Sequence, residues 1–307
     1  MPISIWSLCV LLACSASAEA QDPTFSADVN VVTLLATVRD RDGRIAKNLT
    51  RDDFVLQDDG IPQTISYFAA ESDLPLTVGL LVDTSNSQKG VMEPERKASY
   101  VFLDQVLRED KDKAFVAHFD TRVEVLEGFT SSRQDLAAAL DRLRVPGEIA
   151  TLLYEAIRKT SEDMMRSQHG RKAFILLSDG VSFRDKTSIG TAIEYAQRAD
   201  TIIYSILFAD RGKFYRPGRA AVLAISRQHG RNVMRRLARE TGGAYFEISD
   251  SNPIEKAYAE IEDALRNQYS IGYTPQSTGQ PGEYHKIKLT TKRPDLIVQT
   301  RDGYYSK

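Results

Sequence analysis

The stretch Leu76-Thr-Val-Gly-Leu-Leu-Val-Asp-Thr-Ser-Asn-Ser87 decides the fold, because it joins a mostly apolar run to a short polar run. Residues 76–82 have the near-continuous apolar character of a strand that is covered on both faces of a sheet. The polar residues Asp83, Ser85 and Ser87 follow at once, in the spacing D-x-S-x-S. We therefore expect a buried parallel strand whose carboxyl end carries a group of oxygen donors.

Further apolar strands alternate with helices after this stretch. The helices are indicated by apolar residues at helical spacing, as in Ala98, Phe102 and Val106. We predict strands at residues 114–119, 123–126, 173–177, 202–208 and 244–248, and helices at residues 92–107, 132–143, 152–167, 189–196, 233–240 and 253–268. This alternation predicts an α/β fold, with a doubly wound, mainly parallel sheet and helices on both of its faces.

The two ends of the chain follow a different pattern, in which apolar and polar residues alternate and turn residues interrupt the runs. The pairs Asp42-Gly43 and Asp59-Gly60 are such turn signals, and both ends are typical of antiparallel β-structure. Neither end has enough strands to bury a sheet face alone, so we expect both to form one small β-domain. The expected organisation is a β segment at 21–72, an α/β domain at 73–268 inserted after it, and a second β segment at 269–307 that packs with the first.

Two further residues offer oxygen donors at the same edge of the predicted sheet. Thr151 precedes a predicted helix, and Asp179 directly follows a predicted strand. Ligands of open parallel sheets bind beyond the carboxyl ends of the strands, so we expect these residues to meet Asp83, Ser85 and Ser87 there. Carboxylates and hydroxyls suit a hard cation, Mg²⁺ first, with Mn²⁺ or Ca²⁺ as alternatives. The simpler interpretation of each position is a turn or a helix cap.

The order Asp83-x-Ser85-x-Ser87, Thr151 and Asp179, on alternating strands and helices, resembles the von Willebrand factor type A (VWA) domain with its metal-ion-dependent adhesion site (MIDAS). The resemblance implies that Ser85, Ser87 and Thr151 bind the metal directly, while Asp83 and Asp179 act largely through water. It also implies an open metal position that accepts an Asp or Glu of a partner protein.

The VWA resemblance covers roughly residues 74–268, and the flanks resemble a bacterial group of secreted VWFA-related proteins. The flanking motifs are Leu49-Thr-Arg-Asp-Asp-Phe54 with Asp58-Asp-Gly60, and Tyr269-Ser-Ile-Gly-Tyr-Thr-Pro275 with Gly303-Tyr304. One position departs from the family, which often has Gly-Gly-Thr or Gly-Thr where this chain has Ala150-Thr151.

Residues 1–20 have the layout of a cleaved secretory signal peptide, with a short apolar run followed by small residues and cleavage sites after Ala18 and Ala20. The run is too short to span a bilayer, and no later segment is a candidate transmembrane helix. Leu11-Leu-Ala-Cys14 also resembles a bacterial lipobox, so a lipid anchor at Cys14 is the alternative. We expect a secreted protein, or one of the periplasm or cell envelope.

The composition narrows the classes of function. A formal net charge of −2 over 307 residues argues against binding nucleic acid through bulk charge. Cys9 and Cys14 are the only cysteines, which excludes a disulfide scaffold and a cysteine zinc site. We expect a non-enzymatic protein-binding module. The alternatives are a metal-dependent hydrolase or phosphatase that uses the same carboxylates, and a structural envelope protein that the metal stabilises.

Overall fold

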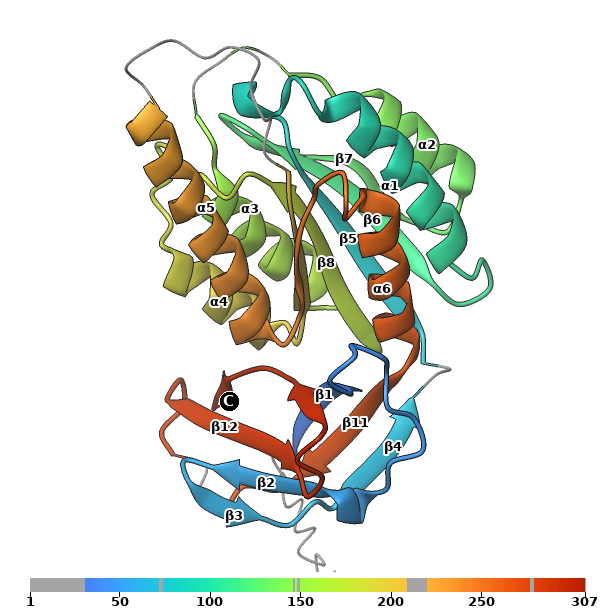
Figure 1. The fold of residues 1–307 in the computed structure, drawn as a ribbon, viewed down its shortest axis with the longest axis vertical. Helices are drawn as coiled ribbons and strands as arrows, with labels where there is room; N and C mark the ends of the chain where they lie inside the picture. The colour runs from blue at the N-terminus through green and yellow to red at the C-terminus, as the bar shows by residue number, and fades with distance from the viewer. Residues whose placement is uncertain are drawn as a thin grey trace, which may run out of the picture.

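The computed structural model describes residues 31–71, 74–145, 147, 150–208, 220–276 and 279–306. The signal peptide expected at 1–20, and with it Cys14, lies outside the described residues. The described chain forms two parts, an α/β domain in the middle of the sequence and a β-domain made from both ends (Figure 1). None of its described helices combines the length and the apolar character needed to cross a membrane.

The α/β domain is built on a six-stranded sheet with the order β10-β9-β8-β5-β6-β7. All neighbouring strands are parallel except β6 and β7. The strands are β5 (Leu76–Asp83), β6 (Lys113–Phe119), β7 (Val123–Thr130), β8 (Arg171–Ser178), β9 (Ile202–Leu207) and β10 (Tyr245–Glu247). Every residue of β5 and β8 is buried, which explains why both read as apolar runs.

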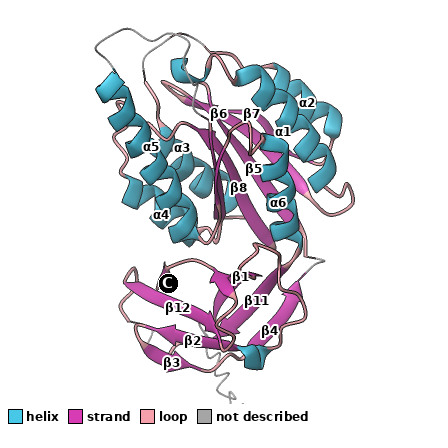
Figure 2. Cartoon of the chain, in the orientation of Figure 1, coloured by secondary structure: helices cyan, strands magenta, loops and turns pink. Residues whose placement is uncertain are grey.

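Helices cover both faces of this sheet (Figure 2). The helices α1 (Met92–Val106), α2 (Arg133–Asp141) and α6 (Ile254–Arg266) pack on one face, and α3 (Leu153–Thr160), α4 (Ile189–Arg198) and α5 (Ala220–Thr241) on the other. Successive residues of β5 point to opposite faces, so Leu80 joins Phe102 in one core and Leu81 joins Ile157 in the other.

The β-domain consists of two four-stranded antiparallel sheets, β13-β1-β11-β4 and β14-β12-β2-β3. In each sheet a strand from the start of the chain pairs with one from the end, as in β1–β11 and β2–β12. Its strands are β1 (Val32–Arg39), β2 (Phe54–Asp58), β3 (Ile61–Gln63), β4 (Tyr67–Glu71), β11 (Gln268–Tyr273), β12 (Tyr284–Thr291), β13 (Ile297–Gln299) and β14 (Gly303–Tyr305). The predicted fold class, an α/β domain inserted into a β-domain built from both ends, is confirmed.

Two helices differ from the sequence prediction. The helix expected at 233–240 is α5, which already begins at Ala220. Residues 224–229 of this helix are exposed or partly exposed, so they do not extend the buried apolar stripe on which the prediction relied. The helix expected at 152–167 is α3 followed by a π-helical turn at Ser161–Met165. Neither difference moves the edge of the sheet on which the oxygen donors lie.

Candidate metal centre

Asp83 and Asp179 lie side by side at the carboxyl edge of the six-stranded sheet. Asp83 is the last residue of β5, and Asp179 comes directly after β8. The two strands are parallel neighbours, with Val82 paired to Leu177. The strand pairing therefore brings both side chains to one edge of the sheet.

Asp83 is fully buried, and hydrogen bonds hold its carboxylate in place. Its Oδ1 accepts from the backbone N–H of Ser85 at 2.9 Å, and its Oδ2 accepts from the hydroxyl of Ser178 at 2.6 Å. The Ser178 hydroxyl also accepts from the N–H of Gly180 at 3.0 Å. These bonds tie the segment after β5 to the segment after β8.

The two serines after Asp83 lead from this buried carboxylate to the surface. The Oγ atoms of Ser85 and Ser87 lie 3.0 Å apart. Ser85 is buried, whereas Ser87 is exposed and its hydroxyl hydrogen-bonds to Asp179. The structure therefore brings together four of the five residues that the sequence analysis assigned to a metal.

The fifth residue, Thr151, reaches the same edge on a separate loop. Its backbone N–H donates to the carbonyl of Phe183 at 2.9 Å, and the Phe183 N–H returns a bond of 3.0 Å. The next N–H, that of Leu152, donates to the carbonyl of Asp120 just after β6 at 3.0 Å. The loop is thus fixed beside the segments that follow β6 and β8. Within the described residues, no hydrogen bond joins the Thr151 hydroxyl to Asp83.

The electrostatics of this edge favour a bound cation. Burial, and then repulsion from Asp179, raises the pKa of Asp83 to about 7, although hydrogen bonds from Ser178 and Ser85 oppose the shift. Burial also raises the pKa of Asp179, against a hydrogen bond from the Val181 N–H. No lysine or arginine of the described chain acts on either carboxylate strongly enough to offset this. The edge is a buried centre of negative charge.

The comparison with protein families identifies the domain that carries this arrangement. A model of the von Willebrand factor type A domain matches residues 78–260, which is more than half of the 307 residues. The chain belongs to this family. The matched range contains all five residues described above, on the strands and loops of the VWA domain. A search of functionally curated proteins gave no match.

Solved structures share the fold of the VWA domain. Proximal thread matrix protein 1 from the mussel byssus has a TM-score of 0.50 at 13% identity, over 68% of this chain and 51% of that chain. A structure of the same mussel protein with a zinc-occupied MIDAS motif has a TM-score of 0.51 at 13% identity, over 68% of this chain and 49% of that one. This chain therefore spans about half the length of the mussel protein. At this identity the likeness shows the fold alone.

The VWA domain has a third buried carboxylate near this pair, which the sequence analysis missed. Glu95 in α1 is 1% exposed, and neither of its oxygens has a hydrogen-bond partner among the described residues. Burial, followed by the charges of Asp83 and Asp179, raises its pKa well above the usual value. A Glu in the first turn of a helix is common at exposed helix starts, so the sequence carries no signal that Glu95 is buried.

Two glycines let α5 approach the loop that carries Asp179. Gly180 has a φ of +74°, in the left-handed region, and it faces Gly230 of α5. A Cβ on Gly230 would lie 2.0 Å from the carbonyl oxygen of Asp179, and one on Gly180 would lie 2.4 Å from the carbonyl oxygen of Gly230. The position of Asp179 therefore depends on the absence of both side chains.

A second group of potential ligands lies in the β-domain, and it was also missed. Asp58, Asp59 and His285 each place a potential ligand atom within 4.8 Å of the others. The sequence analysis interpreted Asp59-Gly60 as a turn and as part of a flanking family motif, and nothing in the sequence pairs it with a histidine more than two hundred positions away.

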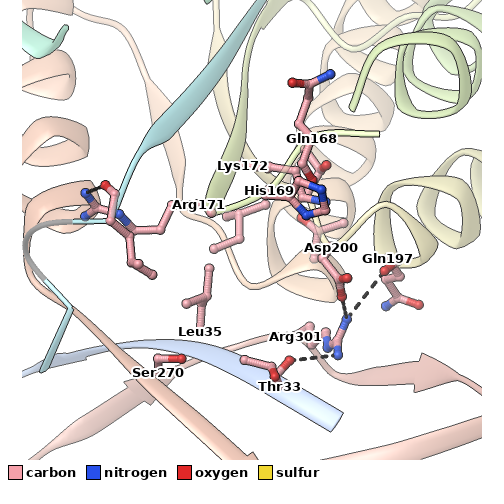
Figure 3. A pocket seen from close by; sticks show the side chains of 15 residues that line it. Thr33, Leu35, Gln168, His169, Arg171, Lys172, Gln197, Asp200, Ser270 and Arg301 are labelled. Carbon is pink, nitrogen blue, oxygen red and sulfur yellow. Dashed lines mark hydrogen bonds and ion pairs between the residues drawn. The ribbon is translucent and has the colours of Figure 1, made fainter. Parts of the chain in front are cut away.

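A cavity of about 360 Å³ lies at the opposite, amino edge of the sheet, where the VWA domain meets the β-domain (Figure 3). Arg301 crosses this space, with hydrogen bonds to the Thr33 carbonyl and to the Asp200 carboxylate, both at 2.9 Å. Arg171 and Lys172 also line it, and both donate to backbone carbonyls. Its cations are engaged by the protein itself, so the cavity is best described as part of the joint between the two parts.

Proposed function

We propose that this chain is an exported, non-enzymatic protein-binding module. Its VWA domain binds a divalent metal through a MIDAS-type site made of Asp83, Ser85, Ser87, Thr151 and Asp179. The metal is Mg²⁺, with Mn²⁺ or Ca²⁺ as alternatives, and the partner is a protein that contributes an Asp or Glu. Nucleic acid is not an expected partner.

The observation that carries this proposal is the uncompensated pair Asp83 and Asp179. Two carboxylates that are buried together, and are offset by no cationic side chain of the described chain, cost free energy unless a cation binds beside them. The hydroxyls of Ser85 and Ser87 add uncharged oxygen donors at the same place. A divalent ion held mainly by neutral hydroxyls and water supplies an open position for a carboxylate from outside.

The site also has the access that such a partner needs. Asp83 and Thr151 are buried, whereas Ser87 is exposed and Asp179 is partly exposed. The buried carboxylate of Asp83 therefore lies below the surface, whereas Ser87 and, in part, Asp179 are open to solvent. Within the described residues, a protein side chain can reach the site without any opening of the fold.

The competing hypothesis is a hydrolase. Thr84 Oγ lies 2.9 Å from His118 Nδ1 and donates to Asp120 Oδ2 at 3.0 Å, which has the composition of a nucleophile, a base and an orienting acid. Thr84, however, is fully buried, so its hydroxyl cannot meet a substrate in this conformation. The contacts are better explained as a network that supports the segment after β5.

The proposed location follows from the sequence. Residues 1–20 act as a secretory signal peptide, and the mature protein is secreted or retained in the periplasm or cell envelope. Lipidation at Cys14 is the alternative route to the envelope. Mass spectrometry of the protein isolated from its native envelope or medium would distinguish the two N-termini.

Metal titration of the purified protein tests the proposal at its first step. Asp83→Ala should weaken Mg²⁺ and Mn²⁺ binding at least a hundredfold in calorimetry, because it removes a central acceptor of the site. Asp163→Ala removes an exposed acid from the same domain and should leave the affinity unchanged. Equal affinity of the two variants would refute the metal site.

Partner capture tests the second step. The wild-type protein should retain a partner from envelope or medium extracts in Mg²⁺ and release it in EDTA, and Asp83→Ala should retain none. Capture that is unchanged by EDTA and by Asp83→Ala would instead support a structural role in which the metal only stabilises loops. Turnover of phosphoesters by the wild type but not by Asp83→Ala would support the hydrolase.

A further inference from the structure

A second charged cluster lies in the β-domain, on strands of a different sheet from the VWA edge. Asp58 is the last residue of β2, and Asp59 begins the turn to β3 with a φ of +48°. β12 pairs with β2 and carries His285, whose Nδ1 lies 2.9 Å from Asp59 Oδ2 and 4.0 Å from Asp58 Oδ1. Two carboxylates from the start of the chain thus meet an imidazole from its end.

This cluster contains buried polar atoms that no described residue satisfies. Asp58 and His285 are each 5% exposed, and neither Asp58 Oδ1 nor His285 Nε2 has a hydrogen-bond partner in the described part of the chain. A buried carboxylate oxygen without a partner is costly in free energy, so Asp58 Oδ1 calls for an explanation such as an ion. Asp58 Oδ1 faces the ring of His285, which points to a ligand in the space between them.

The surrounding residues hold the ligand atoms in place. Asp58 Oδ2 accepts hydrogen bonds from the hydroxyls of Tyr273 at 2.8 Å and Tyr304 at 3.1 Å, and this leaves Oδ1 as the oxygen that is directed at His285. The ring of His285 stacks on Tyr304, with centroids 5.0 Å apart. Asp59 Oδ1 accepts from the backbone N–H of Lys286 at 2.8 Å, which fixes the second carboxylate. Such outer contacts orient the ligands of metal sites.

We propose that Asp58, Asp59 and His285 bind a single transition-metal ion, Zn²⁺ being the best match. Zn²⁺ accepts imidazole nitrogen together with carboxylate oxygen, whereas Mg²⁺ prefers oxygen ligands alone. The ligand atoms are Asp58 Oδ1, Asp59 Oδ2 and His285 Nδ1. To bind the ion, Nδ1 must offer a lone pair, so the bound neutral imidazole carries its one proton on Nε2, and a second proton, where the ring holds one, leaves to solvent.

The second ring nitrogen and the open side of the cluster agree with this assignment. Once Nδ1 binds the ion, the remaining N–H of His285 is on Nε2. Nε2 and Glu283 Oε2 both border the small space beside Gly279, since a Cβ there would lie 2.8 Å from the first and 2.5 Å from the second. The two atoms are not hydrogen-bonded to each other in the described structure, but a carboxylate that accepts from the outer N–H of a metal-bound histidine is a common second contact. The Asp59 side chain is 49% exposed, so the ion and a completing water have a path from solvent.

The ion would join the two ends of the chain within the β-domain. Its ligands come from β2, from the turn after it and from β12, and these strands already share backbone pairing and a hydrophobic core. Metal binding to the folded state alone raises stability, so Zn²⁺ should raise the melting temperature of the β-domain. This proposal is independent of the proposed MIDAS-type site.

The test uses the mature chain carrying Asp83→Ala, which removes metal binding at the proposed MIDAS-type site of the VWA domain. Calorimetry with ZnCl₂ should show one remaining site, and MgCl₂ should show none. Adding Asp59→Asn should weaken Zn²⁺ binding at least tenfold, since Asn tolerates the positive φ of this position but is a poor ligand. Adding Asp52→Asn, which removes an exposed acid from the same part of the chain, should change nothing.

A second variant and a second readout keep the proposal open to refutation. His285→Gln should also weaken Zn²⁺ binding at least tenfold, and it should abolish the rise in melting temperature with ZnCl₂. Absence of Zn²⁺ binding in the Asp83→Ala chain would overturn the proposal. So would Zn²⁺ affinity that is equal in the Asp59→Asn and Asp52→Asn variants, since the cluster would then be a histidine–carboxylate ion pair.

Discussion

Two buried carboxylates at opposite edges of the same sheet, Asp83 and Asp112, have opposite surroundings. Asp112 lies just before β6 and accepts hydrogen bonds from the Leu76 N–H at 2.9 Å and from the Arg108 guanidinium at 3.0 Å. Arg266, the last residue of α6, adds a bond at 3.2 Å. Asp83, at the carboxyl end of β5, is hydrogen-bonded by uncharged groups alone within the described structure.

The pKa shifts of the two groups reflect this difference. Burial alone would raise the pKa of Asp112, but hydrogen bonds from Arg108 and Leu76 and the charge of Arg266 outweigh burial and lower it. For Asp83 the balance is reversed, and the pKa rises to about 7. The chain thus neutralises the charge at the edge that faces the β-domain and leaves the charge at the other edge without compensation. Perturbed carboxylates of the second kind concentrate at functional sites.

Removing one charge at each edge should give the largest effect on stability. Asp112→Asn should lower the free energy of unfolding by about 3 kcal/mol, because it leaves Arg108 and Arg266 partly buried without their partner. Asp83→Asn should raise it in metal-free protein at pH 8, because it removes a buried charge that lacks a partner. Urea unfolding in EDTA measures both values.

The matched control for this pair is Asp163→Asn, an exposed acid for which we expect a change within about 0.5 kcal/mol. Excess Mg²⁺ should reverse the order of wild type and Asp83→Asn, since only the wild type gains stability from the metal. If Asp112→Asn and Asp83→Asn destabilised the metal-free protein equally, the proposed contrast between a compensated and an uncompensated carboxylate would be wrong.

Much of the fold could be predicted from the sequence, because strands that are buried on both faces of a sheet appear as apolar runs. The strands β5 and β8 are buried at every position and therefore read as uninterrupted apolar runs. The expected helix start at Ser132 is confirmed, since its hydroxyl accepts from the Asp135 N–H. The length of α5 was not readable, because an exposed helical segment carries no apolar period.

The candidate site could be predicted from the sequence where the order of the residues and the direction of the strands determine which side chains lie at the same edge of the sheet. Asp83 and Asp179 follow two parallel strands, so their meeting requires only that the strands be neighbours. Glu95 and the pairing of His285 with Asp59 depend instead on helix rotation and on the register of strands from opposite ends of the chain. No local pattern fixes either quantity, and both groups were therefore missed.

The dependence of stability on pH should sharpen the contrast between the edges. A carboxyl group whose pKa is higher in the folded than in the unfolded state binds protons more tightly when folded. Its contribution therefore favours folding at low pH and is lost as pH rises toward the folded pKa. For Asp83, with a folded pKa of about 7 against an ordinary value of 3.8, the window runs from about pH 4 to pH 7.

Metal-free wild type should lose roughly 2–3 kcal/mol between pH 4 and pH 6 relative to Asp83→Asn, at 1.36 kcal/mol per pKa unit. Asp112, with its lowered pKa, contributes in the opposite sense and loses its stabilising effect as pH falls. The measurement is the difference between the urea stability profiles of wild type and Asp83→Asn in EDTA. Parallel profiles would show that Asp83 is not protonated in the folded metal-free protein.

The smallest expected effect on stability comes from Gly230→Ala, which separates the geometry of the charged edge from its charge. The new Cβ would meet the Asp179 carbonyl oxygen at 2.0 Å, so the loop must move, at a cost of about 1–3 kcal/mol. Alanine recovers about 1 kcal/mol of helix propensity within α5, which leaves a net loss of about 0–2 kcal/mol.

Mg²⁺ affinity should nevertheless fall several-fold in Gly230→Ala, because the displaced loop carries a carboxylate of the site. Gly190→Ala is the matched control: it too lies in a helix, but its Cβ would meet nothing closer than Ser188 Oγ at 3.7 Å. This control should gain up to about 1 kcal/mol of stability and keep the affinity of the wild type. Unchanged Mg²⁺ affinity in both glycine variants would mean that the site tolerates movement of Asp179. The uncompensated charge of this edge would then matter more than the placement of its atoms.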